Sequence, residues 1–182
     1  IHFGDGMNPL VGALPTELVI DVSASAPLAG LAELLVAEAV ASRCGGGAVR
    51  NRLCEVIVVL MARQAIAMGT VNGGLLAGLA HPQLHTSLIA MHDQPDYPWR
   101  VDELAKMTGL SRSGFAQTFT AVVGQTPGAY LTGWRLALGR HYLASGRRVK
   151  QVAAMVGFGS QEAFSRAFSR VYGCPPSVVE SY

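Results

Sequence analysis

The sequence predicts a mainly α-helical chain in which two helix-turn-helix modules are joined by a linker helix and preceded by a helical pair and a short β segment. Three observations predict this fold class. One pattern of apolar residues, glycines and serines occurs at 101–124 and again at 149–173. Elsewhere, apolar residues recur every three to four positions, as on one face of a helix. Half of the 182 residues are hydrophobic and only 14% are charged, which favours a folded chain with a buried core.

Composition also excludes several classes of protein. No apolar run approaches the roughly 18–20 residues that span a bilayer, so no contact with a membrane is expected. The sequence has three cysteines and no C-x-x-C pair, which argues against a disulfide framework and a structural zinc site. This cysteine usage fits a protein of the reducing cytoplasm. We expect all three side chains to be buried in the protein: Cys44, Cys54 and Cys174. The chain begins at Ile1 and not at methionine, so we expect a fragment that lacks its natural N-terminus.

Residues 1–78 are expected to form one part of the chain. Residues 1–25 mix glycine, proline and short apolar runs, which are typical of strand ends and turns. Two helices follow at 27–42 and 49–68, separated by a run of glycines. The second helix is apolar on several faces and must be covered on several sides. We expect the pair to pack against a missing domain, a second copy of the chain, or both.

Residues 79–182 are expected to form the second part. A helix is predicted from Pro82 to the proline-rich stretch that begins at Pro95. Three histidines lie in or beside it, and no cysteine, aspartate or glutamate completes a cluster at ligand spacing, so we predict no metal site: His81, His85 and His92.

The duplicated segment carries the pattern of a helix-turn-helix in each copy. A short helix ends at Gly109 or Gly157, as a helix stop in the left-handed conformation requires. Ser111 or Ser160 then stands where the N-cap of a second helix belongs. A plain helical hairpin is the alternative for one copy, but two copies with the same glycines and serines favour two helix-turn-helix modules.

The apolar spacing predicts which side chains these modules bury. The second helix of each copy has apolar residues at i, i+4 and i+7, and these are expected in the core: Phe115, Phe119 and Val122, then Phe164, Phe168 and Val171. Between the copies an apolar stripe predicts one continuous helix over 127–148, which would hold the modules about 25–30 Å apart. This is close to one turn of B-DNA, about 34 Å.

The charge distribution points to a polyanion as the partner. From Arg112 through Arg170 there are eight basic residues and only one acidic residue, Glu162, a net charge of +7. Residues 1–81 hold four basic and six acidic residues, a net charge of −2. A segment this basic suits nucleic acid, although a solvated helical surface is the alternative interpretation.

The exposed faces of the second helices supply candidate DNA-binding residues. They carry short hydrogen-bonding side chains with an arginine or glutamine one turn in, the types that contact base edges in a major groove. The candidates are Arg112, Ser113, Ala116, Gln117 and Thr120 in the first copy, and Gln161, Glu162, Ser165, Arg166, Ser169 and Arg170 in the second. Glu162 has a second interpretation, because an acid in the first turn also stabilises its own helix dipole.

Two segments, PWRVDELAKMTGLSRSGFAQTFTAVVGQTPGAYLTGWRL and VKQVAAMVGFGSQEAFSRAFSRVYGCPP, strongly resemble the DNA-binding domain of AraC/XylS-type transcription regulators. The resemblance covers about residues 82–180. It implies that both recognition helices enter successive major grooves of a promoter, with Gln117 and Arg166 as the best candidates for base contacts. The sequence departs from the family at Gly139, where alanine is usual, and at Val179–Glu180, which replaces a usual Tyr-Arg.

The N-terminal part resembles the companion half of the same family more weakly. NPLVGALPTEL looks like the last strand of a cupin-like effector barrel, and the helices at 28–68 look like its dimerisation and linker helices. The resemblance implies a homodimer through 28–68, a small-molecule effector bound by the missing N-terminal domain, and RNA polymerase as a further partner.

We therefore predict a cytoplasmic, sequence-specific DNA-binding transcription regulator, a ligand-responsive activator without a cofactor. The alternative is a helical protein–protein adaptor that has lost sequence-specific DNA binding. An enzyme is not expected, because no nucleophile–base pair, carboxylate pair or phosphate loop stands at useful spacing. The run Gly45–Gly47 lacks the following Lys-Ser/Thr of a phosphate loop and is interpreted as a helix breaker.

Overall fold

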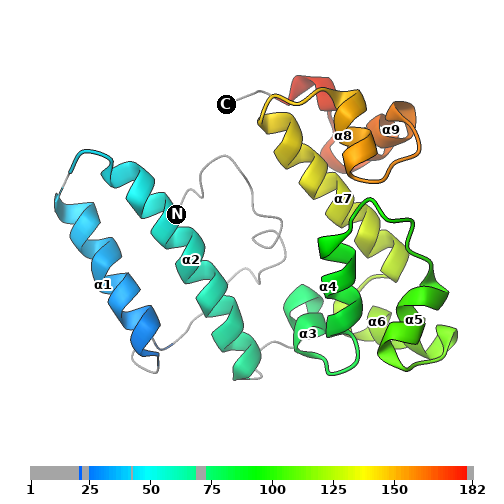
Figure 1. The fold of residues 1–182 in the computed structure, drawn as a ribbon, viewed down its shortest axis with the longest axis horizontal. Coiled ribbons are helices and arrows are strands. Elements are labelled where there is room, and N and C mark those ends of the chain that lie inside the picture. Colours follow the sequence, from blue (N-terminus) through cyan, green and yellow to red (C-terminus); the bar gives the residue numbers. More distant parts are fainter. Residues whose placement is uncertain (1–20, 22–24, 42, 69–72, 180–182) are drawn as a thin grey trace. The chain divides into compact units, whose positions relative to one another are not determined.

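The computed structural model describes residues 21, 25–41, 43–68 and 73–179 (Figure 1). They fall into two units, one before residue 72 and one from there on, and each is described by itself. The β segment predicted within residues 1–25 lies almost wholly outside the described residues. No helix in the described ranges is both long and apolar enough to cross a bilayer.

The first unit is a hairpin of two helices, α1 (Ala26–Ala41) and α2 (Gly46–Ala67). The predicted helical pair is confirmed, although α2 begins three residues earlier than expected. Gly45 allows the tight connection, because it takes a φ of 76° in the left-handed region. Near the turn, the Arg43 guanidinium lies 3.2 Å from the Glu38 carboxylate, which is largely buried in the hairpin.

The expectation that the cysteines are buried is wrong. Cys44 is exposed, and Cys54 and Cys174 are half-buried, all three as free thiols. Cys44 lies in the turn between α1 and α2, and its side chain is open to solvent. Cys54 lies on α2, which packs only one face against α1, so a two-helix hairpin leaves much of its surface open.

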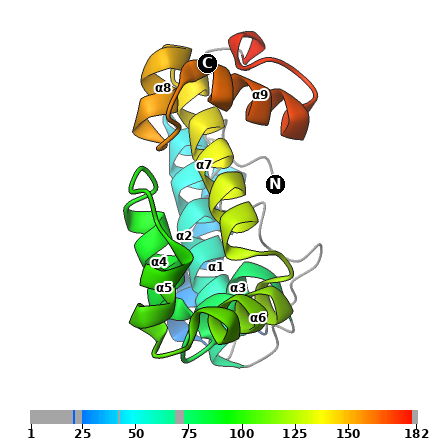
Figure 2. The ribbon, with the colours of Figure 1, turned by 90° about the vertical axis from the view of Figure 1, so that its right-hand side faces the viewer.

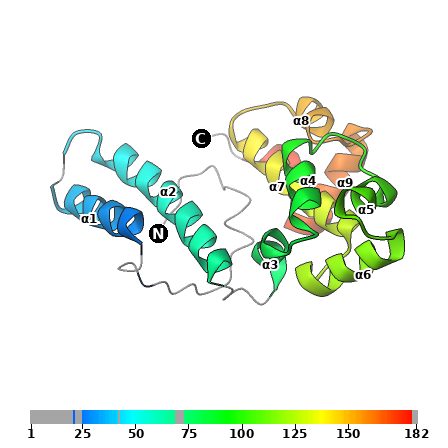
Figure 3. The same ribbon diagram turned by 60° about the horizontal axis from the view of Figure 1, so that its bottom comes forward.

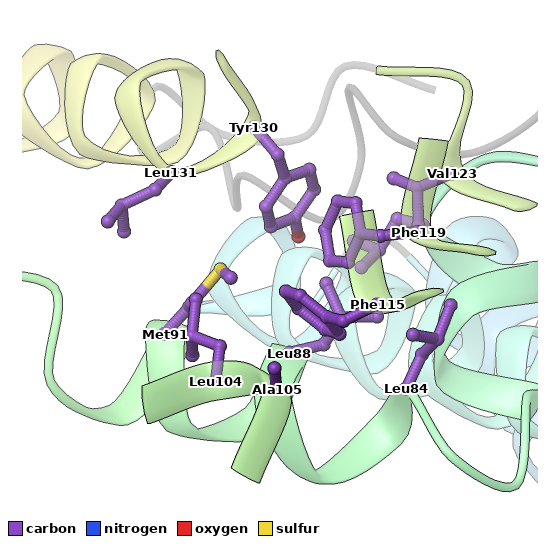
Figure 4. Packing of buried hydrophobic residues seen from close by; sticks show 11 residues of the cluster. Leu84, Leu88, Met91, Leu104, Ala105, Phe115, Phe119, Val123, Tyr130 and Leu131 are labelled. Carbon is purple, nitrogen blue, oxygen red and sulfur yellow. The ribbon is translucent and has the colours of Figure 1, made fainter. Parts of the chain in front are cut away.

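The first half of the second unit packs four helices around one core: α3 (Gly74–Ala80), α4 (His85–Asp93), α5 (Val101–Thr108) and α6 (Arg112–Val123). Figure 4 shows this core, in which Phe115 and Phe119 of α6 lie among side chains of α4, α5 and the following helix. Its buried residues are Leu75, Leu84, Leu88, Met91, Leu104, Ala105, Phe115, Phe119, Val123, Tyr130 and Leu131.

Helix α3 has no counterpart among the predicted helices, and the helix predicted from Pro82 begins at His85. The α3 segment, GLLAGLA, is short and contains two glycines, so its sequence favours a loop. Tertiary packing overrides that preference. A Cβ at Gly78 would lie 2.6 Å from a Leu88 methyl and 2.9 Å from a Val123 methyl, so only glycine lets α3 approach α4 and α6 this closely.

The linker helix α7 (Pro127–Ala144) belongs to two cores at once (Figure 2). Tyr130 and Leu131 pack in the first core, whereas Leu136 and Leu143 pack in a second core with α8 (Val149–Met155) and α9 (Gln161–Tyr172). A short 3-10 helix at Pro176–Val178 follows α9. The predicted mainly helical fold with two helix-turn-helix modules and a linker helix is confirmed.

Helix α7 ends four residues before the predicted end at Arg148. Gly146 takes a φ of 80°, and the Arg147 amide donates to the Tyr142 carbonyl, which closes the helix in the manner of a glycine stop. The 18 residues of α7 still give a rise of about 27 Å, within the range expected from the sequence.

One predicted core residue is misplaced. Val171 is 56% exposed, and Tyr172 at the next position packs against the second core instead. The Tyr172 ring lies 4.5 Å from the Phe168 ring, and the Arg140 guanidinium lies over its other side at 5.2 Å. A large ring with two such neighbours fills the space at the end of α9, so the smaller valine turns to solvent. Val122, also predicted to be buried, is only half-buried, and its neighbour Val123 is the valine that enters the first core.

Candidate nucleic-acid interface

Both helix-turn-helix turns have the caps that the sequence predicted. The Ser111 hydroxyl accepts a hydrogen bond from the Gly114 amide at 3.1 Å, and the Ser160 hydroxyl accepts one from the Ala163 amide, also at 3.1 Å. Gly109 and Gly157 have φ values of 69° and 75°, the left-handed conformation that ends the preceding helix. These turns set where each second helix begins, at α6 and α9 (Figure 3).

Paired phenylalanines fix the rotation of each second helix about its own axis. Phe115 and Phe119 are fully buried with ring centroids 5.6 Å apart, and Phe164 and Phe168 are fully buried at 5.5 Å. Because these rings occupy one face of each helix, the opposite face is held towards solvent. The phenylalanine pairs therefore decide which side chains a partner meets.

The candidate DNA-binding residues all lie on or beside these open faces. Eight are exposed: Arg112, Ser113, Gln117, Thr120, Gln161, Glu162, Arg166 and Arg170. Three are half-buried, namely Ala116, Ser165 and Ser169. None is in either core, so all eleven remain candidates for contact with a partner.

In the first module, two polar side chains also have partners within the module. Arg112 Nε lies 3.4 Å from Asp102 Oδ1 of α5, and both side chains are substantially exposed, so the pair is weak. The Thr120 hydroxyl donates to the Ala116 carbonyl at 2.7 Å, so its proton is used within α6 and its oxygen can still accept a hydrogen bond. The sequence pattern missed Asp102, and its spacing to Arg112 across the turn carried no recognisable signal.

In the second module, Glu162 acts on its own helix. A hydrogen bond from its own backbone amide and one from Ser160 lower the pKa of this carboxyl, with smaller effects from the charges of Arg166 and Lys150. These contacts favour the capping interpretation of Glu162 over a contact to a base. The Arg166 side chain is exposed one turn further along α9.

The two modules differ in charge. From Arg100 to Gly124 the first holds three basic and two acidic residues, a net charge of +1. From Arg148 to Gly173 the second holds four basic residues and one acidic residue, a net charge of +3. The second module therefore presents the more positive potential to a polyanion. In the part of the chain that the structure describes, no cluster of three or more His, Cys, Asp or Glu side chains could hold a metal ion.

Comparison with known proteins identifies the architecture. A model described as a helix-turn-helix domain matches residues 104–181, and a model described as a cupin matches residues 2–67. Regulatory protein SoxS of Salmonella typhimurium is 34% identical over 101 residues, which cover 54% of this chain and 94% of SoxS. The chain belongs to the AraC family of transcription regulators.

Two further similarities concern the length and the fold of this AraC-family chain. The transcriptional regulator AlkR of Acinetobacter baylyi is 33% identical over 182 residues, covering 97% of this chain and 58% of AlkR. A regulator with an AraC-type DNA-binding domain from Chromobacterium violaceum is 24% identical, with a TM-score of 0.51 over 54% of this chain and 88% of that chain, and shares the fold. The chain spans less than two thirds of the length of the first curated relatives that it matches.

Proposed function

We propose that this AraC-family regulator binds double-stranded promoter DNA sequence-specifically, with α6 and α9 in two successive major grooves. One observation carries the proposal: two capped recognition helices with polar open faces belong to the two cores that a single 18-residue helix joins. The rise of that helix, about 27 Å, approaches the roughly 34 Å between successive turns of one groove.

The exposed side chains suggest a division between base contacts and phosphate contacts. Gln117 is suited to a bidentate pair with adenine and Arg166 to one with guanine, because each offers two polar atoms at the spacing of those base edges. Arg148 and Lys150 are exposed at the start of α8, where cations can bind the phosphate backbone. Phosphate contacts hold the chain on DNA, and base contacts select the sequence.

The regulatory part of the proposal follows from the family. We infer that the protein is a cytoplasmic, ligand-responsive activator that recruits RNA polymerase and acts by binding instead of catalysis. The cupin match at residues 2–67 supports an effector domain as the source of ligand control. The relative RclR of Escherichia coli, 34% identical over 133 residues, is named as a transcriptional activator. This similarity supports activation, as opposed to repression, by the present chain.

We also infer that the α1–α2 hairpin is a surface for self-association. Exposed apolar side chains lie along both helices: Leu34, Val36, Val40, Val49, Val56 and Met68. Apolar surface of this kind is uncommon on a monomer in water and marks a contact with another protein surface. We favour a second copy of the chain as the partner, because the helices at 28–68 resemble the dimerisation and linker helices of the family.

Selection of bound sequences from a pool of random duplex DNA tests the DNA-binding proposal. The chain is expected to enrich one motif made of two unlike half-sites about 10–10.5 base pairs apart. Binding without any enriched motif would contradict the proposal, and would favour a helical adaptor that has kept the fold without its sequence specificity.

A further inference from the structure

The loop between α4 and α5 connects the two modules by a second route besides the linker helix. It runs from Gln94 to Arg100, directly before the first module, and its backbone lies against α7 and the turn of the second module. Figure 1 shows this loop leaving the end of α4 and passing α7 before α5 begins.

Arg135 of α7 binds the loop through two nitrogens of its guanidinium group. Its Nε donates to the Pro95 carbonyl oxygen at 2.6 Å, and its Nη2 donates to the Tyr97 carbonyl oxygen at 2.8 Å. Two bonds from one planar group to two carbonyls fix the direction of the loop as well as its distance from α7. Partial burial lowers the pKa of Arg135, and the nearby charge of Asp96 opposes that shift.

The same loop touches the turn of the second module at Gly157. A Cβ at this position would lie 2.7 Å from the Asp96 Cα, 2.8 Å from the Asp96 carbonyl oxygen and 2.9 Å from Arg135 Nη2. Gly157 therefore has two roles, because it ends α8 with a φ of 75° and it also admits the loop backbone. At the equivalent turn of the first module, a Cβ at Gly109 would meet nothing within 4 Å.

The loop is also tied to the first module. The Tyr97 hydroxyl donates to the Glu103 carboxylate of α5 at 3.2 Å, and the Arg100 amide donates to the same carboxylate at 2.9 Å. The Trp99 indole N–H donates to the Gln94 carbonyl at 2.9 Å, which closes the loop on itself. Contacts thus run without a break from α5 through the loop to Arg135 and on to the turn at Gly157.

We propose that Arg135, the 95–97 backbone and Gly157 form a clamp that fixes the orientation of the second module relative to the first, and that Arg135 is its positioning residue. A linker helix alone holds two modules through one set of contacts along α7. A second contact away from its axis resists rotation of one module about that axis. None of the clamp residues is among the candidate DNA-binding residues, so its effect on binding is expected to be indirect.

The clamp has a consequence for operator choice, which rests on the proposed binding to two grooves. One added base pair between the half-sites moves the second groove by about 3.4 Å and turns it by about 35°. A chain with a fixed angle between modules should reject that change. A chain whose modules can rotate should tolerate it, at the expense of affinity for the preferred spacing, because preorganisation is lost.

The orientation itself can be measured in the free protein, without DNA. Spin labels are attached in the full chain at two exposed positions, Lys106→Cys in α5 and Gln151→Cys in α8, after replacement of the three native cysteines. Labelled chain is diluted with unlabelled chain, and pulsed electron paramagnetic resonance gives the distribution of distances within one chain. Arg135→Met is compared with Arg135→Lys. Arg140→Met is the control, because it also removes an arginine from α7, but the contact it loses, with the Tyr172 ring, lies within the second module.

We expect a narrow distance distribution in the parent chain and in Arg140→Met, a broad one in Arg135→Met, and an intermediate one in Arg135→Lys, which keeps the charge but cannot bridge two carbonyls. Unchanged widths in both Arg135 variants would overturn the clamp. If a thermal melt shows that Arg135→Met is not folded, the width of the distance distribution in Arg135→Lys alone tests the clamp.

The second arm measures binding to the selected site and to a site with one extra base pair. The affinity of Arg135→Met for DNA should fall about tenfold at the preferred half-site spacing and much less at the longer spacing. The variant should therefore discriminate less between the two sites. Equal losses at both spacings would contradict a positioning role. If the parent chain binds no DNA specifically, the proposed function fails, while the distance distributions still decide whether the clamp exists.

Discussion

Arg166 is the single residue on which base recognition by the second module is expected to depend most. Arg166→Ala should weaken the binding free energy by about 1–3 kcal/mol at the preferred site and by much less on random DNA. The reason is that a bidentate pair with guanine is lost only where that guanine is present. Fluorescence anisotropy titrations on both duplexes measure the difference. Gln117→Ala is the companion in the first module and should weaken the other half-site.

Equal losses on both duplexes would make Arg166 a phosphate contact, since phosphates are the same in every sequence. Arg170→Ala provides the comparison, because this side chain is also exposed but lies one turn further from the start of α9.

His92 is the residue whose charge state is linked to the stability of the first core. Its ring stacks on Trp134 with centroids 3.8 Å apart, and its Nε2 is hydrogen-bonded to the Tyr130 hydroxyl. Burial lowers the pKa of His92 to about 4, against a smaller opposing effect of Asp93. Burial also raises the pKa of Tyr130, so the phenol stays protonated beside a neutral imidazole.

Acid should therefore destabilise the protein through His92. The pKa of His92 is about 4 in the folded chain, below the ordinary value of 6.5, so the unfolded chain binds more protons between these values. Stability contributed by the neutral ring is complete above pH about 6.5 and falls as the pH drops towards 4, by about 3 kcal/mol in all. Urea unfolding of His92→Gln at several pH values should show a weaker loss across this window.

His141→Gln is the matched control for that series, because it removes an exposed histidine of α7 that belongs to neither core. An identical pH dependence in His92→Gln and the parent chain would contradict the linkage to His92.

At the scale of helices, Gly139 governs how closely α7 approaches α9. A Cβ at Gly139 would lie 2.8 Å from Phe164 Cε2 and 2.9 Å from Cζ, and Phe164 is fully buried. Gly139→Ala should therefore be destabilising: overpacking costs about 1–3 kcal/mol, and the helix propensity gained is only about 1 kcal/mol. A Cβ at Gly133 on the same helix would meet nothing within 4 Å, so Gly133→Ala should raise the free energy of unfolding by about 1 kcal/mol.

Urea unfolding of both variants tests this difference in sign. In a Phe164→Leu background, Gly139→Ala should lose most of its cost, because the ring that it strikes is gone. If both glycine substitutions stabilised the chain equally, close packing would not explain Gly139. Glycine in place of the family's alanine would then only lower the helix propensity of α7.

Sequence patterns predicted the helices that carry their own signals. The caps at Ser111 and Ser160 and the stops at Gly109 and Gly157 are local, so each is visible within a few residues of the chain. The same patterns led to the correct open faces of α6 and α9, because the buried phenylalanines mark the opposite side.

Features that depend on distant contacts could not be predicted in this way. Helix α3 exists because Gly78 fits between Leu88 and Val123, and Val171 faces solvent because Tyr172 packs with Phe168 and Arg140. Arg135 was one basic residue among eight, and only the folded chain brings it to the carbonyls of Pro95 and Tyr97. The resemblance to a family supplied the place of Gly139 but not its reason.

At the scale of the whole molecule, the α1–α2 hairpin is expected to bring copies of the chain together. Light scattering of the purified chain should show dimers or larger species, because Val36, Val40 and Val56 expose 63%, 80% and 47% of their surface. Val40→Glu with Val56→Glu should shift the mass towards the monomer. A clean monomer of the parent chain at high concentration would count against this surface.

The central claim is that one chain binds two successive major grooves through two unlike modules. Footprinting on the selected site tests it most directly, with five base pairs inserted between the half-sites as the comparison. We expect an asymmetric footprint over about two turns of DNA, with half-site centres about 10–10.5 base pairs apart. The insertion puts the second groove on the opposite face of the duplex, so affinity should collapse towards that of one module. A palindromic footprint that does not depend on the inner spacing would contradict binding by both modules, because only one module of each chain would then bind DNA.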